Sequence, residues 1–164
     1  MGPLEQIRLA LWAFPMTTIH LLTPADLPTM RAMLALFGRV FDEPDTFGAA
    51  PPSDAWLAQL LARDTFVALA AVRDGAVVGG LAGYILPKYE QARSEGYIYD
   101  LAVDAAHRRQ GIATSLIAAM TREAKARGAW VVFVQADHGD DPAIALYTKL
   151  GAREDVLHFD IPVD

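Results

Sequence analysis

The sequence lacks cysteine altogether, which excludes disulfides, thiolate nucleophiles and iron–sulfur ligands. This absence is compatible with a reducing cytoplasm, where we expect the protein to reside. Long apolar runs are also missing, since no stretch approaches the ~20 residues that a membrane-spanning helix needs. The formal net charge is -6, so binding to nucleic acid or to an anionic membrane is disfavoured. The same negative charge would attract a cationic small molecule.

Several catalytic motifs are absent as well. The chain has no Walker loop, no dinucleotide-binding glycine fingerprint and no serine nucleophile elbow. Its four histidines (His20, His107, His138 and His158) do not show the spacing of a metal site. We therefore predict an activity that needs no bound metal.

The 164 residues, of which 53% are hydrophobic, are enough for one globular domain. We predict a single domain over residues 16–164, preceded by an extension of uncertain role over residues 1–15. The apolar stretch Ile7–Met16 contains Pro15 and no cleavage pattern, so we do not read it as a signal peptide. Two alternatives stay open for it. Met16 is the natural start, or Ile7–Phe14 contacts a second subunit in a homodimer.

Hydrophobic periodicity predicts a mixed α/β fold. Asp74-Gly75 indicates a hairpin, and the acidic, proline-containing stretch 42–52 indicates a loop. Gly128 and Gly151 indicate the ends of two helices. A helix between consecutive strands implies a central parallel pair in an otherwise antiparallel sheet. The predicted strands are 17–22, 65–73, 76–86, 96–103, 130–136 (buried) and 156–163, and the predicted helices begin at Thr23, Ser53, Gln110 and Asp141.

The turn Arg108–Thr114 is the segment most indicative of function. Gly111 and Ala113 leave backbone N–H groups unobstructed at the start of a helix, where the helix dipole is positive. Such a turn can bind a pyrophosphate, and Arg108 and Arg109 can neutralise further phosphate charge. The alternative is a basic, solvated helix start. The position of the turn, between an apolar strand and a long helix, favours phosphate binding.

The pattern Arg108-x-x-Gly111-x-Ala113, with this order of elements, resembles the GCN5-related N-acetyltransferases. The resemblance implies acetyl-coenzyme A as donor, with its pyrophosphate on the amides of residues 109–114. It further implies that the pantetheine arm lies between strands ending near Val103 and Ala136, and that amides near Leu101–Val103 stabilise the oxyanion. The implied coenzyme-binding residues are Leu101, Ala102, Val103, Arg108, Arg109, Gln110, Gly111, Ile112, Ala113 and Thr114.

Longer segments are similar to the aminoglycoside 3-N-acetyltransferases of type I. They comprise residues 86–95, 97–103, 107–114, 134–142, 145–151 and 158–161. The resemblance implies acetylation of the 3-amino group of an aminoglycoside antibiotic, which confers resistance. It covers nearly everything from about Met30 onward. Residues 1–15 have no counterpart, and His138 stands where these enzymes have a tyrosine, which bears on substrate preference.

Two residues are candidates for proton transfer. Tyr147 lies in the helix where the family places its general acid, although a tyrosine there could simply pack at the edge of the core. Asp100 interrupts an apolar strand, where a carboxylate is costly unless it is paired or hydrogen-bonded. It either takes the proton of a substrate ammonium or accepts structural hydrogen bonds. The resemblance favours the catalytic role for both residues.

Acidic residues are dense in three loops, and aminoglycoside ammonium groups need such partners. We prefer solvated loop charge as the explanation for Asp42, Glu43 and Asp45. The chemistry also allows a polyamine or peptide amine as acceptor, or a non-catalytic module that binds acetyl-coenzyme A. The predicted substrate-binding residues are Asp137, His138, Asp140 and Asp141, followed by Glu90 and Glu95.

Overall fold

The structure is a computed structural model that describes residues 16–163. The two alternatives for the N-terminal extension therefore lie outside the described residues. The chain divides into two compact units, one ending at Val134 and the other starting at Gln135, and each is described by itself. None of the helices within 16–163 is long and apolar enough to cross a membrane.

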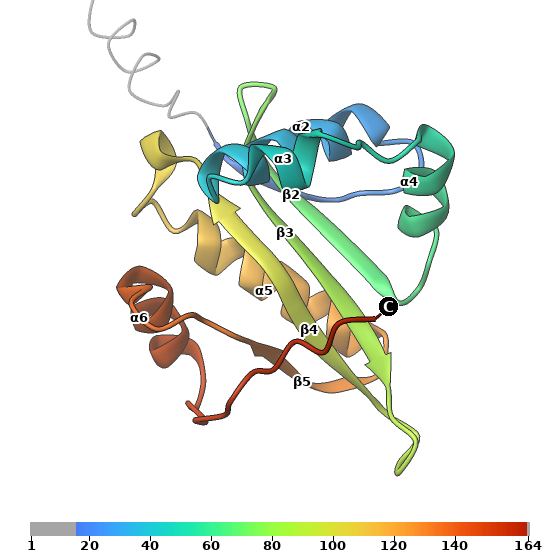
Figure 1. Cartoon of the computed structure of the whole chain (residues 1–164), viewed down its shortest axis with the longest axis vertical. Helices are drawn as coiled ribbons and strands as arrows, with labels where there is room; N and C mark the ends of the chain where they lie inside the picture. The colour runs from blue at the N-terminus through green and yellow to red at the C-terminus, as the bar shows by residue number, and fades with distance from the viewer. Residues whose placement is uncertain (1–15, 164) are drawn as a thin grey trace, which may run out of the picture. The chain divides into compact units, whose positions relative to one another are not determined.

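The first unit is built on one five-stranded sheet (Figure 1). The strand order is β1-β2-β3-β4-β5; the first four strands are antiparallel, and β4 pairs with β5 in parallel, which confirms the predicted mixed sheet. Asp74 and Gly75 join β2 to β3 with φ of 50° and 78°, as a tight hairpin requires. The elements of this unit are β1 (Thr18–Leu21), α2 (Leu27–Val40), α3 (Pro44–Gly48), α4 (Asp54–Leu61), β2 (Phe66–Arg73), β3 (Ala76–Pro87), β4 (Ser94–Val103), a 3-10 turn (Ala105–His107), α5 (Ile112–Ala126) and β5 (Ala129–Val134).

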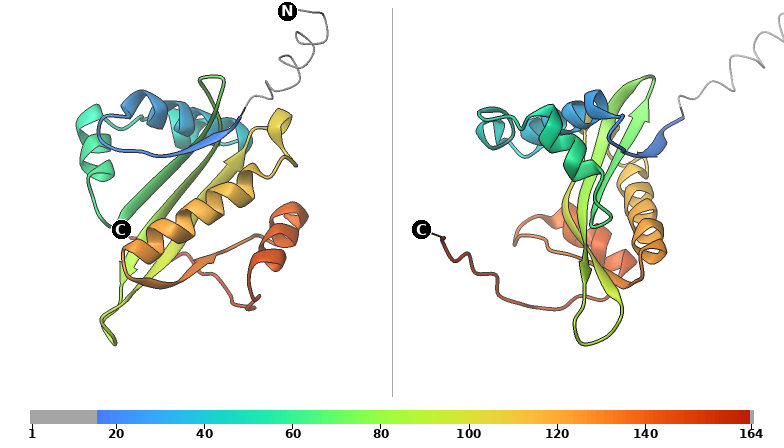
Figure 2. Two further views of the ribbon diagram at one scale, coloured as in Figure 1. Left: turned by 180° about the vertical axis from the view of Figure 1, so that it is seen from behind. Right: turned by 90° about the vertical axis from the view of Figure 1, so that its right-hand side faces the viewer.

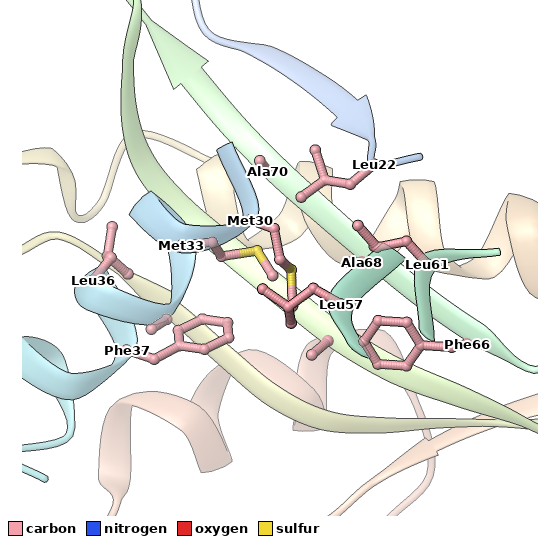
Figure 3. Packing of buried hydrophobic residues seen from close by; sticks show 12 residues of the cluster. Leu22, Met30, Met33, Leu36, Phe37, Leu57, Leu61, Phe66, Ala68 and Ala70 are labelled. Carbon is pink, nitrogen blue, oxygen red and sulfur yellow. The ribbon is translucent and has the colours of Figure 1, made fainter. Parts of the chain in front are cut away.

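Helices cover both faces of this sheet (Figure 2). On one face α5 packs Leu116 and Met120 against β2, β3 and β4. On the other face α2 and α4 bury a second core, in which Met33, Phe37 and Leu57 point toward the strands (Figure 3). Gly80 permits this approach, because a Cβ there would collide with the Met33 side chain.

Strand β4 contains a bulge that changes which face its side chains occupy. Its pairing with β3 runs from Ala82↔Asp100 directly to Gly83↔Ile98, so Tyr99 is an extra residue on β4. Ile98 belongs to the core under α5, whereas Ala102 belongs to the core under α2 and α4. Asp100, two residues before Ala102, therefore lies on the α2–α4 face of the sheet.

Several predicted boundaries are wrong. The first helix begins at Leu27 rather than at Thr23, because the Asp26 carboxylate accepts hydrogen bonds from the Thr23 N–H and hydroxyl (2.8 and 2.7 Å) and closes a turn before the helix. The predicted loop 42–52 contains the short helix α3. Ser53 does cap α4, accepting from the Trp56 N–H at 3.2 Å. The strand predicted as buried at 130–136 is β5, whose side chains are exposed or half-buried.

The second unit contains one helix, α6 (Asp141–Leu150), and the extended segment 152–163 (Figure 1). Gly151 ends α6 as predicted. The strand predicted at 156–163 is absent, since these residues join no sheet ladder within the part of the chain that the structure describes. A strand exists only through hydrogen bonds to a neighbouring strand, and apolar periodicity cannot reveal whether such a neighbour is present.

Candidate active site

The turn that precedes α5 has a backbone shape suited to an anion. Arg109 and Gly111 both adopt left-handed φ angles, of 58° and 79°, which turn successive N–H groups to one side. Gly111 is also the N-cap of α5, and within residues 16–163 this helix start has no side-chain cap hydrogen bond. The amides at the positive end of the helix dipole are therefore available to a phosphate group.

The turn Arg108–Thr114 has open space around its glycine and is anchored to neighbouring strands, and both features fit the binding of a phosphate group. A Cβ on Gly111 would meet no atom within 4 Å, and Arg108, Arg109 and Gln110 are exposed. The Arg108 Nε donates to the Val103 carbonyl at 3.3 Å, which ties the turn to the end of β4. Gln110 accepts from Arg73 Nη1 at 2.7 Å, so its side chain holds the turn to β2. Among the predicted coenzyme residues, Ile112 is buried and offers only its backbone.

Strand β4 presents a free edge next to this turn. Its pairing with β5 ends at Ile98↔Val134, although β4 continues to Val103. The Asp104 N–H donates to Val78 on β3 at 2.9 Å, so by alternation the backbone groups of Val103 and Leu101 face away from β3. The N–H and carbonyl of Leu101 and the N–H of Val103 can therefore hydrogen-bond an extended ligand, whereas the Val103 carbonyl already accepts from Arg108. Ala102 faces the other way and has its side chain buried, so its backbone does not reach the free edge.

Asp100 lines a cavity of about 190 Å³ on the α2–α4 face of the sheet. Burial raises the pKa of its carboxyl above the usual value, and the negative charge of Glu43 raises it further. No described residue forms an ion pair with it. The carboxylate is thus half-buried and without a cationic partner inside the described chain, as a base for an incoming ammonium group requires.

Glu90 and Glu95, predicted to bind substrate, lie in the β3–β4 hairpin, where they already have basic partners. The Lys88 Nζ lies 3.7 Å from Glu90 Oε1 and 3.5 Å from Glu95 Oε1, and Arg93 lies 3.8 Å from Glu90. Glu95 precedes Asp100 by five positions, a separation of roughly 17 Å along an extended strand. The structure therefore gives these two carboxylates a local partner and does not bring them to Asp100.

The remaining predicted residues belong to the second unit. Tyr147 is half-buried in α6, and its pKa is raised, first by burial and then by the charge of Asp140. Asp140, rather than Asp141, is the N-cap of α6, and its carboxylate accepts from the Ala143 N–H at 3.2 Å. Asp137, His138 and Asp141 are exposed. A tyrosine held protonated in this way has the state that a general acid needs.

Sequence reasoning missed the aromatic side chains around Asp100 and the charge that acts on it. The sequence predicts Glu43 to be a solvated loop charge and gives Trp56, Tyr84 and Tyr99 no functional role. These three aromatic residues nevertheless line the same cavity as Asp100. The bulge at Tyr99 determines which face of the sheet Asp100 occupies, and the hydrophobic periodicity of β4 does not reveal this bulge. Among residues 16–163 no group of three or more histidine or acidic side chains is arranged to hold a metal ion.

Comparison with known proteins identifies the family. The sequence profile of the acetyltransferase (GNAT) family matches residues 30–152. An aminoglycoside acetyltransferase from an uncultured soil metagenomic sample is 53% identical, with a TM-score of 0.89, over 91% of this chain and 99% of that one. A second such enzyme, solved in complex with sisomicin, is 35% identical, with a TM-score of 0.83, over 90% and 97% of the two chains.

An N-alpha-acetyltransferase of Sulfurisphaera tokodaii is 34% identical over 89 residues, which span 48% of this chain and 53% of that protein. The matched region therefore covers only about half the length of this relative. The family profile, in contrast, covers the turn Arg108–Thr114, the free edge of β4 and both proton-transfer candidates, Asp100 and Tyr147. The chain belongs to the GNAT family of acetyltransferases, whose members use acetyl-coenzyme A as the acetyl donor.

Proposed function

We propose that this chain acetylates the 3-amino group of an aminoglycoside antibiotic and thereby confers resistance to it. The observation that carries the proposal is the place of Asp100, a half-buried carboxylate without a cationic partner in the described residues, directly before the free edge of β4. Two similar structures, at 53% and 35% identity, are aminoglycoside acetyltransferases, and one holds sisomicin. The 3-amino position rests on the sequence resemblance.

The residues of the first unit fit acetyl-coenzyme A, which supplies an activated acetyl group as a thioester. The amides of residues 111–114 and the guanidinium groups of Arg108 and Arg109 would hold its pyrophosphate. The backbone groups of Leu101 and Val103 would pair with the extended pantetheine arm. The same edge of β4 provides N–H donors for the negative charge that develops on the carbonyl oxygen during attack.

Asp100 and Tyr147 would then move the protons. Asp100 accepts a proton from the substrate ammonium, directly or through water, and leaves a neutral amine. As the carbon–nitrogen bond forms and the carbon–sulfur bond breaks, the Tyr147 hydroxyl protonates the sulfur. The nitrogen loses its second proton as the amide forms, and solvent returns a proton to the Tyr147 phenolate. Transfer is direct in a ternary complex, with no acetyl-enzyme. Asp137, His138, Asp140 and Asp141 would add polar and negative groups for the other ammonium groups of the acceptor, with Glu90 and Glu95 in a secondary role.

The test is the release of free thiol from acetyl-coenzyme A with gentamicin, kanamycin, spermidine and an amine-bearing peptide as separate acceptors. Turnover with the aminoglycosides is expected, and NMR of the product should place the new acetyl group on the 3-nitrogen. Turnover with spermidine or the peptide alone would remove the antibiotic assignment. No turnover with any acceptor, together with retained acetyl-coenzyme A binding, would favour a non-catalytic module.

A peptide amine is the second candidate acceptor. The 34% identity over 89 residues to an N-alpha-acetyltransferase favours it. Peptide N-termini carry one ammonium group, whereas aminoglycosides carry several. The ratio of the two kcat/KM values in the same assay separates the candidates.

A further inference from the structure

Arg73, the last residue of β2, connects two segments that are far apart in the sequence. Its Nε donates to the Thr17 hydroxyl at 2.8 Å, and its Nη1 donates to the Gln110 side-chain oxygen at 2.7 Å. The Arg73 side chain is half-buried, whereas Gln110 is exposed. Because the planar guanidinium group fixes the directions of its N–H groups relative to one another, the two bonds together determine where the Gln110 side chain lies.

No carboxylate neutralises the charge of Arg73. Among residues 16–163 its guanidinium group forms no ion pair with an aspartate or glutamate, and its two hydrogen-bond partners are uncharged. Arg73 therefore brings both a hydrogen bond and a positive charge to the turn Arg108–Thr114. An experiment can separate the two contributions, because lysine keeps the charge and lacks the fork of the guanidinium group.

The turn that Arg73 contacts has a strained backbone. Arg109 has a φ of 58°, in a region that residues other than glycine rarely adopt. Such a conformation persists only where the surrounding contacts hold it. The Arg108 side chain holds the turn to the end of β4, and the bond from Arg73 to Gln110 holds it to the end of β2. The strained residue thus lies between two side-chain anchors.

Close packing does not fix the turn on the side of β2. An open cavity of about 250 Å³ lies there, and its lining residues are Thr17, Ile19, Arg73, Gln110, Ile112 and Ser115. A side chain that borders open space is held by its hydrogen bonds rather than by interlocking neighbours. Loss of the bond from Arg73 would therefore allow Gln110, and the backbone that carries it, to move toward the cavity.

Resting on the proposed binding of the coenzyme pyrophosphate to this turn, we infer that Arg73 is a positioning residue for acetyl-coenzyme A. It holds Gln110 in place and thereby keeps the amides of residues 111–114 directed at the pyrophosphate before the coenzyme binds. A turn that is ordered in advance loses less conformational entropy on binding, which raises the affinity. This role requires no contact between Arg73 and the coenzyme.

The first measurement is the Kd of coenzyme A by isothermal titration calorimetry, which needs no acceptor. Arg73→Lys keeps the charge but not the two directed bonds, so we expect its Kd to rise about tenfold. Gln110→Ala, at an exposed position, should raise the Kd by a similar factor. The double variant should bind no more weakly than either single variant, because both substitutions remove the same contact. A wild-type Kd in Arg73→Lys would overturn the inference and leave only the charge.

A donor without a pyrophosphate gives a readout that general loosening of the fold would not. S-acetylpantetheine carries the same thioester and the same pantetheine arm. In Arg73→Lys, kcat/KM for acetyl-coenzyme A should fall about tenfold with kcat unchanged, whereas kcat/KM for S-acetylpantetheine should stay within about twofold of the wild-type value. Both are measured as thiol release with an acceptor that the wild-type enzyme uses. An equal loss with the two donors would contradict the positioning role.

Two further variants separate this inference from the proposed function. Gly111→Ala disturbs the turn directly, and Arg122→Lys is the matched control, since Arg122 is exposed in the middle of α5. A raised Kd in Gly111→Ala with a wild-type Kd in Arg73→Lys would overturn the inference and leave coenzyme binding at the turn standing. Wild-type Kd values in both would overturn both. Raised Kd values in both, with Arg122→Lys unchanged, would establish Arg73 as a positioning residue.

Discussion

Asp100 carries a carboxyl whose pKa is raised by burial and, to a smaller extent, by Glu43. A general base works only when ionised, so kcat/KM for the acceptor should rise with pH through this raised pKa, above the usual range of aspartate. Asp100→Asn should remove this limb and lower kcat/KM by about 10²–10⁴-fold. The measurement is a pH profile of thiol release with gentamicin. An Asn variant with wild-type kcat/KM would contradict the assignment.

The same variant should change stability in a defined direction. Because the folded-state pKa lies above the unfolded value, the folded chain binds the proton more tightly, and this stabilisation is present at low pH. It is lost as pH rises from the unfolded pKa through the folded one. Asp100→Asn should therefore flatten the pH dependence of the free energy of unfolding in that window, as measured by urea denaturation. An unaltered pH dependence would show that the Asp100 pKa is the same in both states.

Tyr147 has a raised pKa too, first from burial and then from the charge of Asp140. It therefore stays protonated throughout the neutral range and can act as an acid there. Tyr147→Phe is expected to lower kcat by about 10²-fold or more, with little change in the KM for acetyl-coenzyme A. Tyr89→Phe, at an exposed tyrosine outside the proposed site, is the control. Full turnover by Tyr147→Phe would exclude the acid role.

At the scale of elements, two glycines at the ends of α5 form a matched pair. Gly111 and Gly128 have φ of 79° and 80°, and a Cβ at either would meet no atom within 4 Å. Alanine should cost about 1–2 kcal/mol of stability at each position from backbone strain alone. Only Gly111→Ala should also raise the KM for acetyl-coenzyme A, because Gly128 lies at the opposite end of the helix. Equal KM values in the two variants would separate the turn from coenzyme binding.

Elements with a strong local signal were predictable from the sequence. The Asp74-Gly75 hairpin, the Ser53 cap and the Gly151 helix end depend on a few neighbouring residues, and all three were confirmed. The exposure of β5 and the absence of a strand at 156–163 depend on which strands lie alongside, which periodicity does not report. The turn Arg108–Thr114 was recognisable as a motif, whereas the place of Asp100 required the three-dimensional register of β4.

At the scale of the whole molecule, the net charge of -6 acts on every charged ligand. A polycationic acceptor is attracted by this field, so its kcat/KM should fall as salt screens it, by severalfold between low salt and about 0.5 M ionic strength. Acetyl-coenzyme A is an anion, and under the proposed function it would bind at the basic turn Arg108–Thr114, so its on-rate should gain nothing from the overall charge. The check is kcat/KM for gentamicin in increasing sodium chloride, with a singly charged amine as the control. Equal salt dependence for both amines would show that the overall field contributes nothing.

The bulge at Tyr99 holds one extra residue in β4 without moving the residues beyond it to the other face of the sheet. In a regular strand, residues two apart share a face. Ile98 and Asp100 are two apart, yet they lie on opposite faces, because they pair with the adjacent residues Gly83 and Ala82 of β3. If Tyr99 were deleted, Ile98 and Asp100 would be neighbours in a regular strand and would still lie on opposite faces. The register of this strand against β3, rather than the number of its residues, is what an active descendant of this sequence must retain.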